Sequence, residues 1–161
     1  MKNRSGFTIV EVIVVVVVIA ILATISVFSY SRFQVDARDS DRANKTTLLA
    51  EALEKYYDKN GEYPSPQAVI NTVPANTGAA VGTLLSISQD ILVMPKAPSG
   101  TTNSIAPSLG SNDVIAYSAK SDVNNNGCQN SASGGCDEFT MTYKKEADGQ
   151  IVTIKSRHSG R

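Results

Sequence analysis

Two groups of side chains in this sequence have the types and spacing needed for chemistry, and the first is a candidate calcium loop. Asp122, Asn124 and Asn126 occupy alternate positions before Gly127, which matches the first half of an EF-hand-type loop. The bidentate Glu that would complete the loop is missing, since Ser133 stands in its place. We therefore favour an ordinary Asn-rich surface loop, keep a calcium site as the alternative, and expect no cofactor.

The second group is the pair Cys128 and Cys136, the only cysteines of the chain. Outside the cytoplasm they would form a disulfide that closes a short loop rich in Gly, Ser and Asn. A zinc site is not expected, because His158 is the only histidine. The sequence also offers no Ser-His-Asp set, Cys-His pair or phosphate-binding glycine loop, so we do not expect an enzyme.

The charge balance argues against general nucleic-acid binding. The 161 residues include 15 Lys and Arg against 15 Asp and Glu, so the formal net charge is zero and no basic surface field is expected. The length allows one ordinary domain plus an appended segment. That segment lies near the N-terminus, where residues 12–23 contain no polar side chain.

The apolar segment, residues 7–28, is long enough to cross a bilayer. As a helix it would rise about 33 Å at ~1.5 Å per residue. Lys2 and Arg4 precede it and Arg32 is the next cation, so the N-terminus should stay in the cytoplasm and the bulk of the chain outside. Glu11 is unusual in such a segment, because an ionised carboxylate there costs ~2–3 kcal/mol and needs a partner or a function.

The position of Gly6 distinguishes two kinds of targeting segment. A secretory signal peptide has its small-residue cleavage site after the apolar run, whereas here the small residue comes before it. The order MKNRSG followed by FTIVE resembles the leader of type IV prepilins. The resemblance implies that a prepilin peptidase cuts between Gly6 and Phe7, that Phe7 is then N-methylated, and that Glu11 belongs to the motif. Residues 1–6 would thus be a leader peptide.

The new terminus and Glu11 form a candidate assembly pair. Cleavage creates an α-amino cation at Phe7, four residues before Glu11 and on the same helical face. In a stack of offset helices the carboxylate could instead meet the amino terminus of a neighbouring subunit. Unit charges at ~4 Å interact with about 4 kcal/mol at an effective dielectric of ~20, and desolvation takes much of this back. We therefore predict that the pair sets the register of assembly.

Past the membrane segment, the helical pattern continues without Pro or Gly until Gly61. A helix over residues 7–59 would be about 80 Å long at ~1.5 Å per residue, far longer than a domain needs. Its outer half has apolar residues at helical spacing that should face a core. They are Leu49, Leu53, Tyr56 and Tyr57.

The C-terminal region predicts a β-hairpin. Apolar residues alternate with polar ones on both sides of Asp148-Gly149, a strong two-residue turn signal. The residues expected on the face toward the helix include Tyr143, Val152 and Ile154. The pairs expected opposite each other are Ala147–Gln150, Lys145–Val152 and Tyr143–Ile154.

The remaining residues have weaker secondary-structure patterns. Residues 114–117 suit a third strand, and residues 65–112 suit a surface connection in which residues 84–94 form a short helix or strand. The implied fold is α+β and type IV pilin-like: a long N-terminal helix whose outer half packs on a small antiparallel sheet. Residues 29–161 would form the extracytoplasmic domain.

The resemblance implies a structural subunit of a type IV pilus that polymerises through its helix. Its partners would be copies of itself, a prepilin peptidase, an assembly ATPase and a membrane platform protein. The precursor would lie in the cytoplasmic membrane and the product in an extracellular filament. Two alternatives stay open: a pseudopilin of a type II secretion or DNA-uptake machine, and a membrane-anchored adhesive module whose loops over residues 65–138 bind a ligand.

Overall fold

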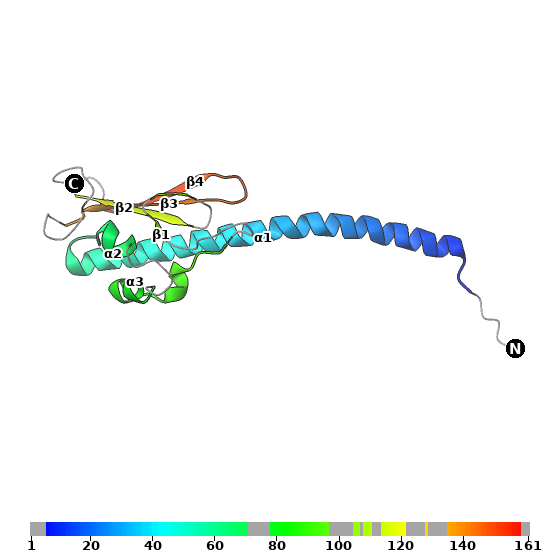
Figure 1. Cartoon of the computed structure of the whole chain (residues 1–161), viewed down its shortest axis with the longest axis horizontal. Coiled ribbons are helices and arrows are strands. Elements are labelled where there is room, and N and C mark those ends of the chain that lie inside the picture. Colours follow the sequence, from blue (N-terminus) through cyan, green and yellow to red (C-terminus); the bar gives the residue numbers. More distant parts are fainter. Residues whose placement is uncertain are drawn as a thin grey trace. The chain divides into compact units, whose positions relative to one another are not determined.

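The computed structural model describes residues 6–70, 78–96, 105–106, 108–110, 114–121, 128 and 135–158. The chain divides into two compact units, Met1–Val35 and Asp36–Arg161. Helix α1, Ile9–Asn60, begins in the first unit and ends in the second (Figure 1). The predicted long helix is therefore present, and it starts at Ile9 rather than at residue 7.

In the first unit, α1 is an apolar helix whose side chains are exposed from Ile9 to Val27. It is long and apolar enough to cross a membrane, and its most apolar stretch has no side chain buried within the chain. The hydroxyls of Thr24 and Ser26 donate to the carbonyls of Ala20 and Leu22, each at 2.8 Å. These polar groups are thereby satisfied inside the helix, as a hydrocarbon environment requires.

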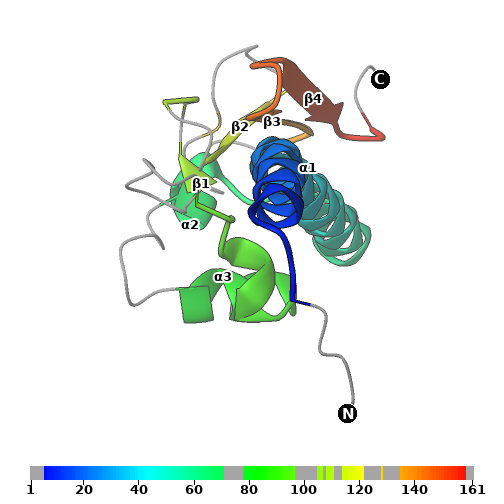
Figure 2. The ribbon, with the colours of Figure 1, turned by 90° about the vertical axis from the view of Figure 1, so that its right-hand side faces the viewer.

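The second unit is built around the outer part of α1. Its other helices are α2 (Pro66–Ile70), α3 (Gly78–Leu85) and the 3₁₀ helix η1 (Gln89–Leu92). Its strands are β1 (Ile105–Ala106), β2 (Ile115–Lys120), β3 (Glu138–Lys144) and β4 (Ile151–Lys155), in the order β1-β2-β3-β4. Figure 2 shows the sheet on one side of α1 and α3 on the other.

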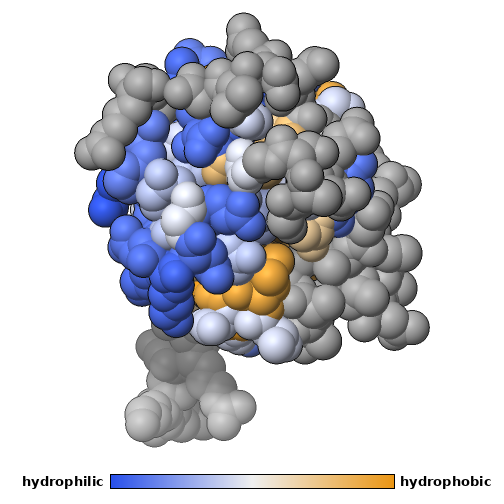
Figure 3. All heavy atoms as spheres, turned by 90° about the vertical axis from the view of Figure 1, so that its left-hand side faces the viewer, coloured by the Kyte–Doolittle hydropathy of each residue, from blue (hydrophilic) through white to orange (hydrophobic). Residues whose placement is uncertain are grey.

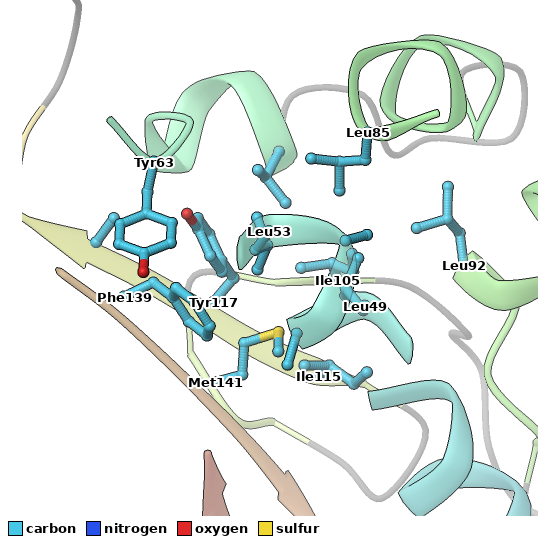
Figure 4. Close-up of a cluster of buried hydrophobic side chains, with 14 of the residues drawn as sticks. Leu49, Leu53, Tyr63, Leu85, Leu92, Ile105, Ile115, Tyr117, Phe139 and Met141 are labelled. Carbon is cyan, nitrogen blue, oxygen red and sulfur yellow. The ribbon is translucent and has the colours of Figure 1, made fainter. Parts of the chain in front are cut away.

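The core of the second unit lies between α1 and the sheet. Leu49 and Leu53 are fully buried and face Tyr117, Phe139 and Met141 from the strands (Figure 4). The helical spacing of apolar residues predicted this face correctly. Tyr56 and Tyr57, predicted with them, are half-buried at the edge of the core.

The surface of the second unit differs from that of the first. Seen from the end where α1 stops, much of the described surface is hydrophilic and borders a small apolar area (Figure 3). Among the described residues, the exposed large apolar side chains of this unit are Leu48, Val93 and Ile151, and the others all belong to the first unit. The second unit is thus suited to water and the first to an apolar environment.

Helix α1 ends directly before Gly61, where the predicted helical pattern stops. The helix ends at Asn60, and Gly61 adopts a φ of 75° while its N–H donates to the carbonyl of Tyr57 at 2.7 Å. This left-handed conformation favours glycine. The chain can then turn back, so that the N–H of Tyr63 reaches the carbonyl of Cys136 at 2.7 Å.

The predicted register of the hairpin was wrong by two residues. Tyr143 pairs with Val152 and Met141 with Ile154, so Ala147 and Gln150 are not opposite each other. The loop between the strands is longer than two residues and is closed where the N–H of Lys145 donates to the carbonyl of Gln150 at 2.9 Å. A shift of two residues leaves every side chain on the same face, so the predicted buried face is correct.

The physical reason for the longer loop is a side chain of α1. The carboxylate of Asp39 accepts the N–H groups of Glu146 and Ala147 at 2.8 and 2.9 Å. These two residues therefore bond to the helix instead of continuing the ladder. The turn signal alone could not reveal this competing acceptor.

One further expectation needs correction. The sheet is mixed rather than wholly antiparallel, because β1 runs parallel to β2 while β2, β3 and β4 are antiparallel neighbours. Residues 84–94, expected as a short helix or strand, include the end of α3 and all of η1. The third strand, expected over residues 114–117, is β2 and continues to Lys120. The α+β class with a long N-terminal helix is confirmed.

Candidate processing and assembly site

The start of α1 is a reciprocal cap formed by Thr8 and Glu11. The carboxylate oxygen Oε2 of Glu11 accepts both the backbone N–H and the hydroxyl of Thr8, each at 2.8 Å. The N–H of Glu11 in turn donates to the hydroxyl oxygen of Thr8 at 3.3 Å. This is a capping box, and it explains why the helix begins at Ile9. The sequence signal is a Thr three residues before a Glu, and this cap was not predicted.

The cap gives the carboxylate a partner within the isolated chain. Phe7, which precedes the helix, is 89% exposed, and it lines one shallow surface together with Val10, Glu11 and Val14. A Cβ added at Gly6 would meet no atom within 4 Å, so the junction between residues 6 and 7 is open. The structure thus brings the predicted site residues to one exposed end of α1, where Glu11 bonds to Thr8.

Comparison with known proteins identifies this end of the chain. Residues 1–27 match the model of the prokaryotic N-terminal methylation motif. The chain carries the signature of type IV prepilin-like proteins. No curated protein and no solved structure matches it. For a prepilin-like chain the motif implies processing by a prepilin peptidase and pilus assembly machinery in general, and the apolar helix fits a membrane-anchored precursor. The signature belongs to structural subunits rather than to a family of enzymes.

The predicted disulfide of the prepilin-like chain is confirmed. Cys128 and Cys136 are both buried and joined, with their Cα atoms 5.6 Å apart. The bond fastens a segment that is itself attached to the end of α1, because Tyr63 and Cys136 form an isolated antiparallel bridge. The backbone of Gly135 also lies against Glu62, where an added Cβ would meet the Cβ of that side chain at 2.6 Å.

Removing the disulfide should lower the free energy of unfolding. Because the bond joins cysteines eight positions apart, chain-entropy bookkeeping predicts a loss of about 2–3 kcal/mol in a Cys128→Ser/Cys136→Ser variant. Thermal unfolding of the full chain in detergent would measure it. Reduction should produce the same loss in the unmodified chain and none in the double variant. Equal stability of the unmodified chain and the double variant, both without reductant, would contradict the prediction.

The calcium candidates Asp122, Asn124 and Asn126 lie outside the described residues. Within the part of the chain that the structure does describe, no group of three or more His, Cys, Asp or Glu side chains could hold a metal ion.

An ion cluster around the buried Arg42, hereafter the Asp39 cluster, joins α1 to the loop between β3 and β4. Arg42 is 1% exposed and donates to Asp39 at 2.7 Å, to Glu146 at 3.2 Å and to the carbonyl of Pro95 at 3.0 Å. Arg38 holds Glu146 through two hydrogen bonds, of 2.9 and 2.6 Å. Together with the two backbone bonds to Asp39, these contacts fix the loop on the helix.

The cluster keeps both carboxylates charged. The Arg38 guanidinium holds the pKa of Glu146 below its usual value against burial, with a further contribution from Arg42. Burial would raise the pKa of Asp39, but the N–H donors of Glu146 and Ala147 and the Arg42 guanidinium outweigh it and lower the pKa. Depressed pKa values of this kind mean that the ionised forms stabilise the fold.

A second contact, hereafter the Glu54 contact, fastens the end of the chain to α1. The buried carboxylate of Glu54 accepts the hydroxyl of Tyr63 and the backbone N–H of Arg157, each at 2.8 Å. His158 stacks on Tyr57, with ring centroids 4.4 Å apart. Burial and the neighbouring Glu54 carboxylate raise the pKa of Tyr63, so its hydroxyl stays a donor.

Proposed function

We propose that this chain is a structural subunit of a type IV pilus. A prepilin peptidase cuts it between Gly6 and Phe7, Phe7 is N-methylated, and the mature subunit polymerises through the apolar part of α1. The observation that carries the proposal is the methylation motif over residues 1–27, placed directly on an exposed apolar helix that continues into a folded unit. The same observation suits a pseudopilin, which shares the processing step.

The proposed division of the chain follows from this role. Residues 1–6 are the leader, residues 7–28 the membrane and assembly segment, and residues 29–161 the extracytoplasmic part. The cations Lys2 and Arg4 favour a cytoplasmic N-terminus. The Cys128–Cys136 disulfide supports an oxidising location for the folded unit. An assembly ATPase and a platform protein then act on the membrane side.

The cap at the start of α1 suggests how assembly begins. In the isolated chain Glu11 accepts two neutral donors of Thr8. In the filament it exchanges them for the methylated amino group of Phe7 on a neighbouring copy. The amino cation adds a Coulomb attraction that the neutral Thr8 donors lack, and this attraction is stronger in an apolar bundle than in water. A subunit in the wrong register would leave the carboxylate without this cation.

Processing is the test of the proposal. The mature protein should begin at Phe7 and carry the mass of one added methyl group, as N-terminal sequencing and mass spectrometry would show. Gly6→Val should leave full-length precursor in the membrane, because the peptidase must fit a larger side chain beside the scissile bond. The chain itself places no atom within 4 Å of the added Cβ, so a loss of processing reports on the peptidase.

Ser5→Ala is the matched control, since it changes the neighbouring leader residue without adding bulk. It should be processed normally. An N-terminus at Met1 in the mature protein, or a cut beyond residue 28, would refute the prepilin-type function.

A further inference from the structure

The helix carries a short aromatic segment just beyond its apolar run. Tyr30 and Phe33 are 65% and 71% exposed, and Arg32 between them is also exposed. These residues belong to the first unit, which ends at Val35. Tyr30, Arg32 and Phe33 are called the interface segment below. Exposed aromatic side chains next to an apolar run indicate a surface that another molecule covers.

The length of the apolar run places this segment at a defined depth. From Ile9 to Val27 the helix rises about 28 Å at ~1.5 Å per residue, close to the ~30 Å of a bilayer core. The Cα atoms of Tyr30 and Phe33 lie roughly 4 and 9 Å beyond that core. The polar layer of one leaflet is about 5–8 Å thick. The interface segment therefore spans the headgroup layer when the apolar run fills the core.

The direction of the side chains strengthens this placement. Helical side chains tilt toward the N-terminus of their helix, which here is the membrane side. Tyr30 and Phe33 are three positions apart and lie on neighbouring parts of one face. Both rings consequently lean back into the headgroup layer, and the Arg32 guanidinium, whose planar donors suit phosphate oxygens, reaches the same level.

We propose that the interface segment binds the phospholipid headgroups of the outer leaflet and fixes the axial position of α1 in the membrane-anchored precursor. The ring of Tyr30 offers an apolar body and a polar tip, as residues of membrane interfaces do. Continuity with the membrane segment favours lipid over a second copy of the chain. The inference rests on the membrane anchoring proposed above.

A single tryptophan can test the depth, because the natural sequence has none. The full chain with Phe33→Trp is reconstituted at a low protein-to-lipid ratio into vesicles of phosphatidylethanolamine and phosphatidylglycerol. We expect its emission to lose most of its intensity to lipids with a nitroxide on the headgroup. Lipids brominated deep in the acyl chain, and iodide in the buffer, should each remove little.

Two control variants calibrate the measurement. Ile19→Trp, in the middle of the apolar run, should be quenched by the bromines. Leu48→Trp replaces an exposed residue of the second unit and should be quenched by iodide alone. These three positions then represent the core, the headgroup layer and water.

The outcomes separate this inference from the proposed function. If Phe33→Trp responds to iodide alone while Ile19→Trp responds to bromines, anchoring stands and the headgroup contact is overturned. If Phe33→Trp is shielded from iodide and from both lipid quenchers, and dilution with lipid exposes it, a second copy covers the segment and the inference is wrong. If Ile19→Trp ignores the bromines, membrane anchoring itself fails and the inference fails with it.

Discussion

Replacing Glu11 by valine should give a subunit that inserts into the membrane but fails to form filaments. Insertion should even improve, because the cost of placing a carboxylate in an apolar segment disappears. Filament yield should fall to background, since no carboxylate remains to pair with the amino terminus of the neighbouring copy. Electron microscopy and a sheared-filament assay on cells expressing only the variant would measure this, with immunoblots of the membrane fraction confirming insertion.

The capping box makes a sharper pair of controls possible. Thr8→Ala removes the hydroxyl donor from the Glu11 carboxylate at a cost of about 0.5–2 kcal/mol in helix capping, but keeps the backbone N–H of residue 8 and leaves the charge in place. Glu11→Gln keeps an acceptor for Thr8 and removes the charge. We expect filaments from Thr8→Ala and none from Glu11→Gln. The opposite pattern would show that Glu11 acts only as a local cap.

Arg42→Met should destabilise the second unit by about 3–5 kcal/mol, the usual cost of removing one partner from a buried ion pair. Arg42 is 1% exposed and bonds to Asp39, Glu146 and Pro95, so its loss leaves two partly buried carboxylates with fewer donors. Chemical denaturation of the full chain in detergent, followed by near-UV circular dichroism, would measure the change.

Lys45→Met is the matched control on the same helix. Lys45 pairs with Asp41 at 2.8 Å, but both side chains are partly exposed, so the loss should be no more than about 1 kcal/mol.

The dependence of the free energy of unfolding on acidic pH is a second test of the Asp39 cluster. Asp39 and Glu146 have lowered pKa values in the folded state, so their stabilisation is present above the unfolded values near pH 4 and is lost as the pH falls through the folded ones. In Arg42→Met this acid-dependent loss should shrink. Equal stability of the two variants would show that the Asp39 cluster contributes little.

Local sequence patterns predicted the elements that depend on neighbouring residues. The helix, its buried face at Leu49 and Leu53, its end at Asn60, and the buried face of the hairpin all follow from periodicities of 3.6 and 2 or from turn residues. The register of the hairpin between β3 and β4 could not be predicted in this way, because it depends on a hydrogen bond between Asp39 and Glu146, which are 107 positions apart. No short-range pattern records such a contact.

The candidate site shows the same division. Gly6, Phe7 and Glu11 were found because their motif is contiguous in the sequence. The Thr8–Glu11 cap is equally local, but it was not predicted, because Glu11 was interpreted as a charge in an apolar segment rather than as a capping residue. Arg38 and Arg42 gave no signal, since charged residues on a helix usually belong to a solvated face. Only the folded unit shows that Arg42 is buried.

The Asp39 cluster and the Glu54 contact attach the folded unit to α1 at two places, one at each end of the segment that crosses it. In a filament of the proposed kind, tension would be transmitted along the axis of α1. A pull in that direction loads both attachments, so the folded unit stays on its helix as long as either of them holds.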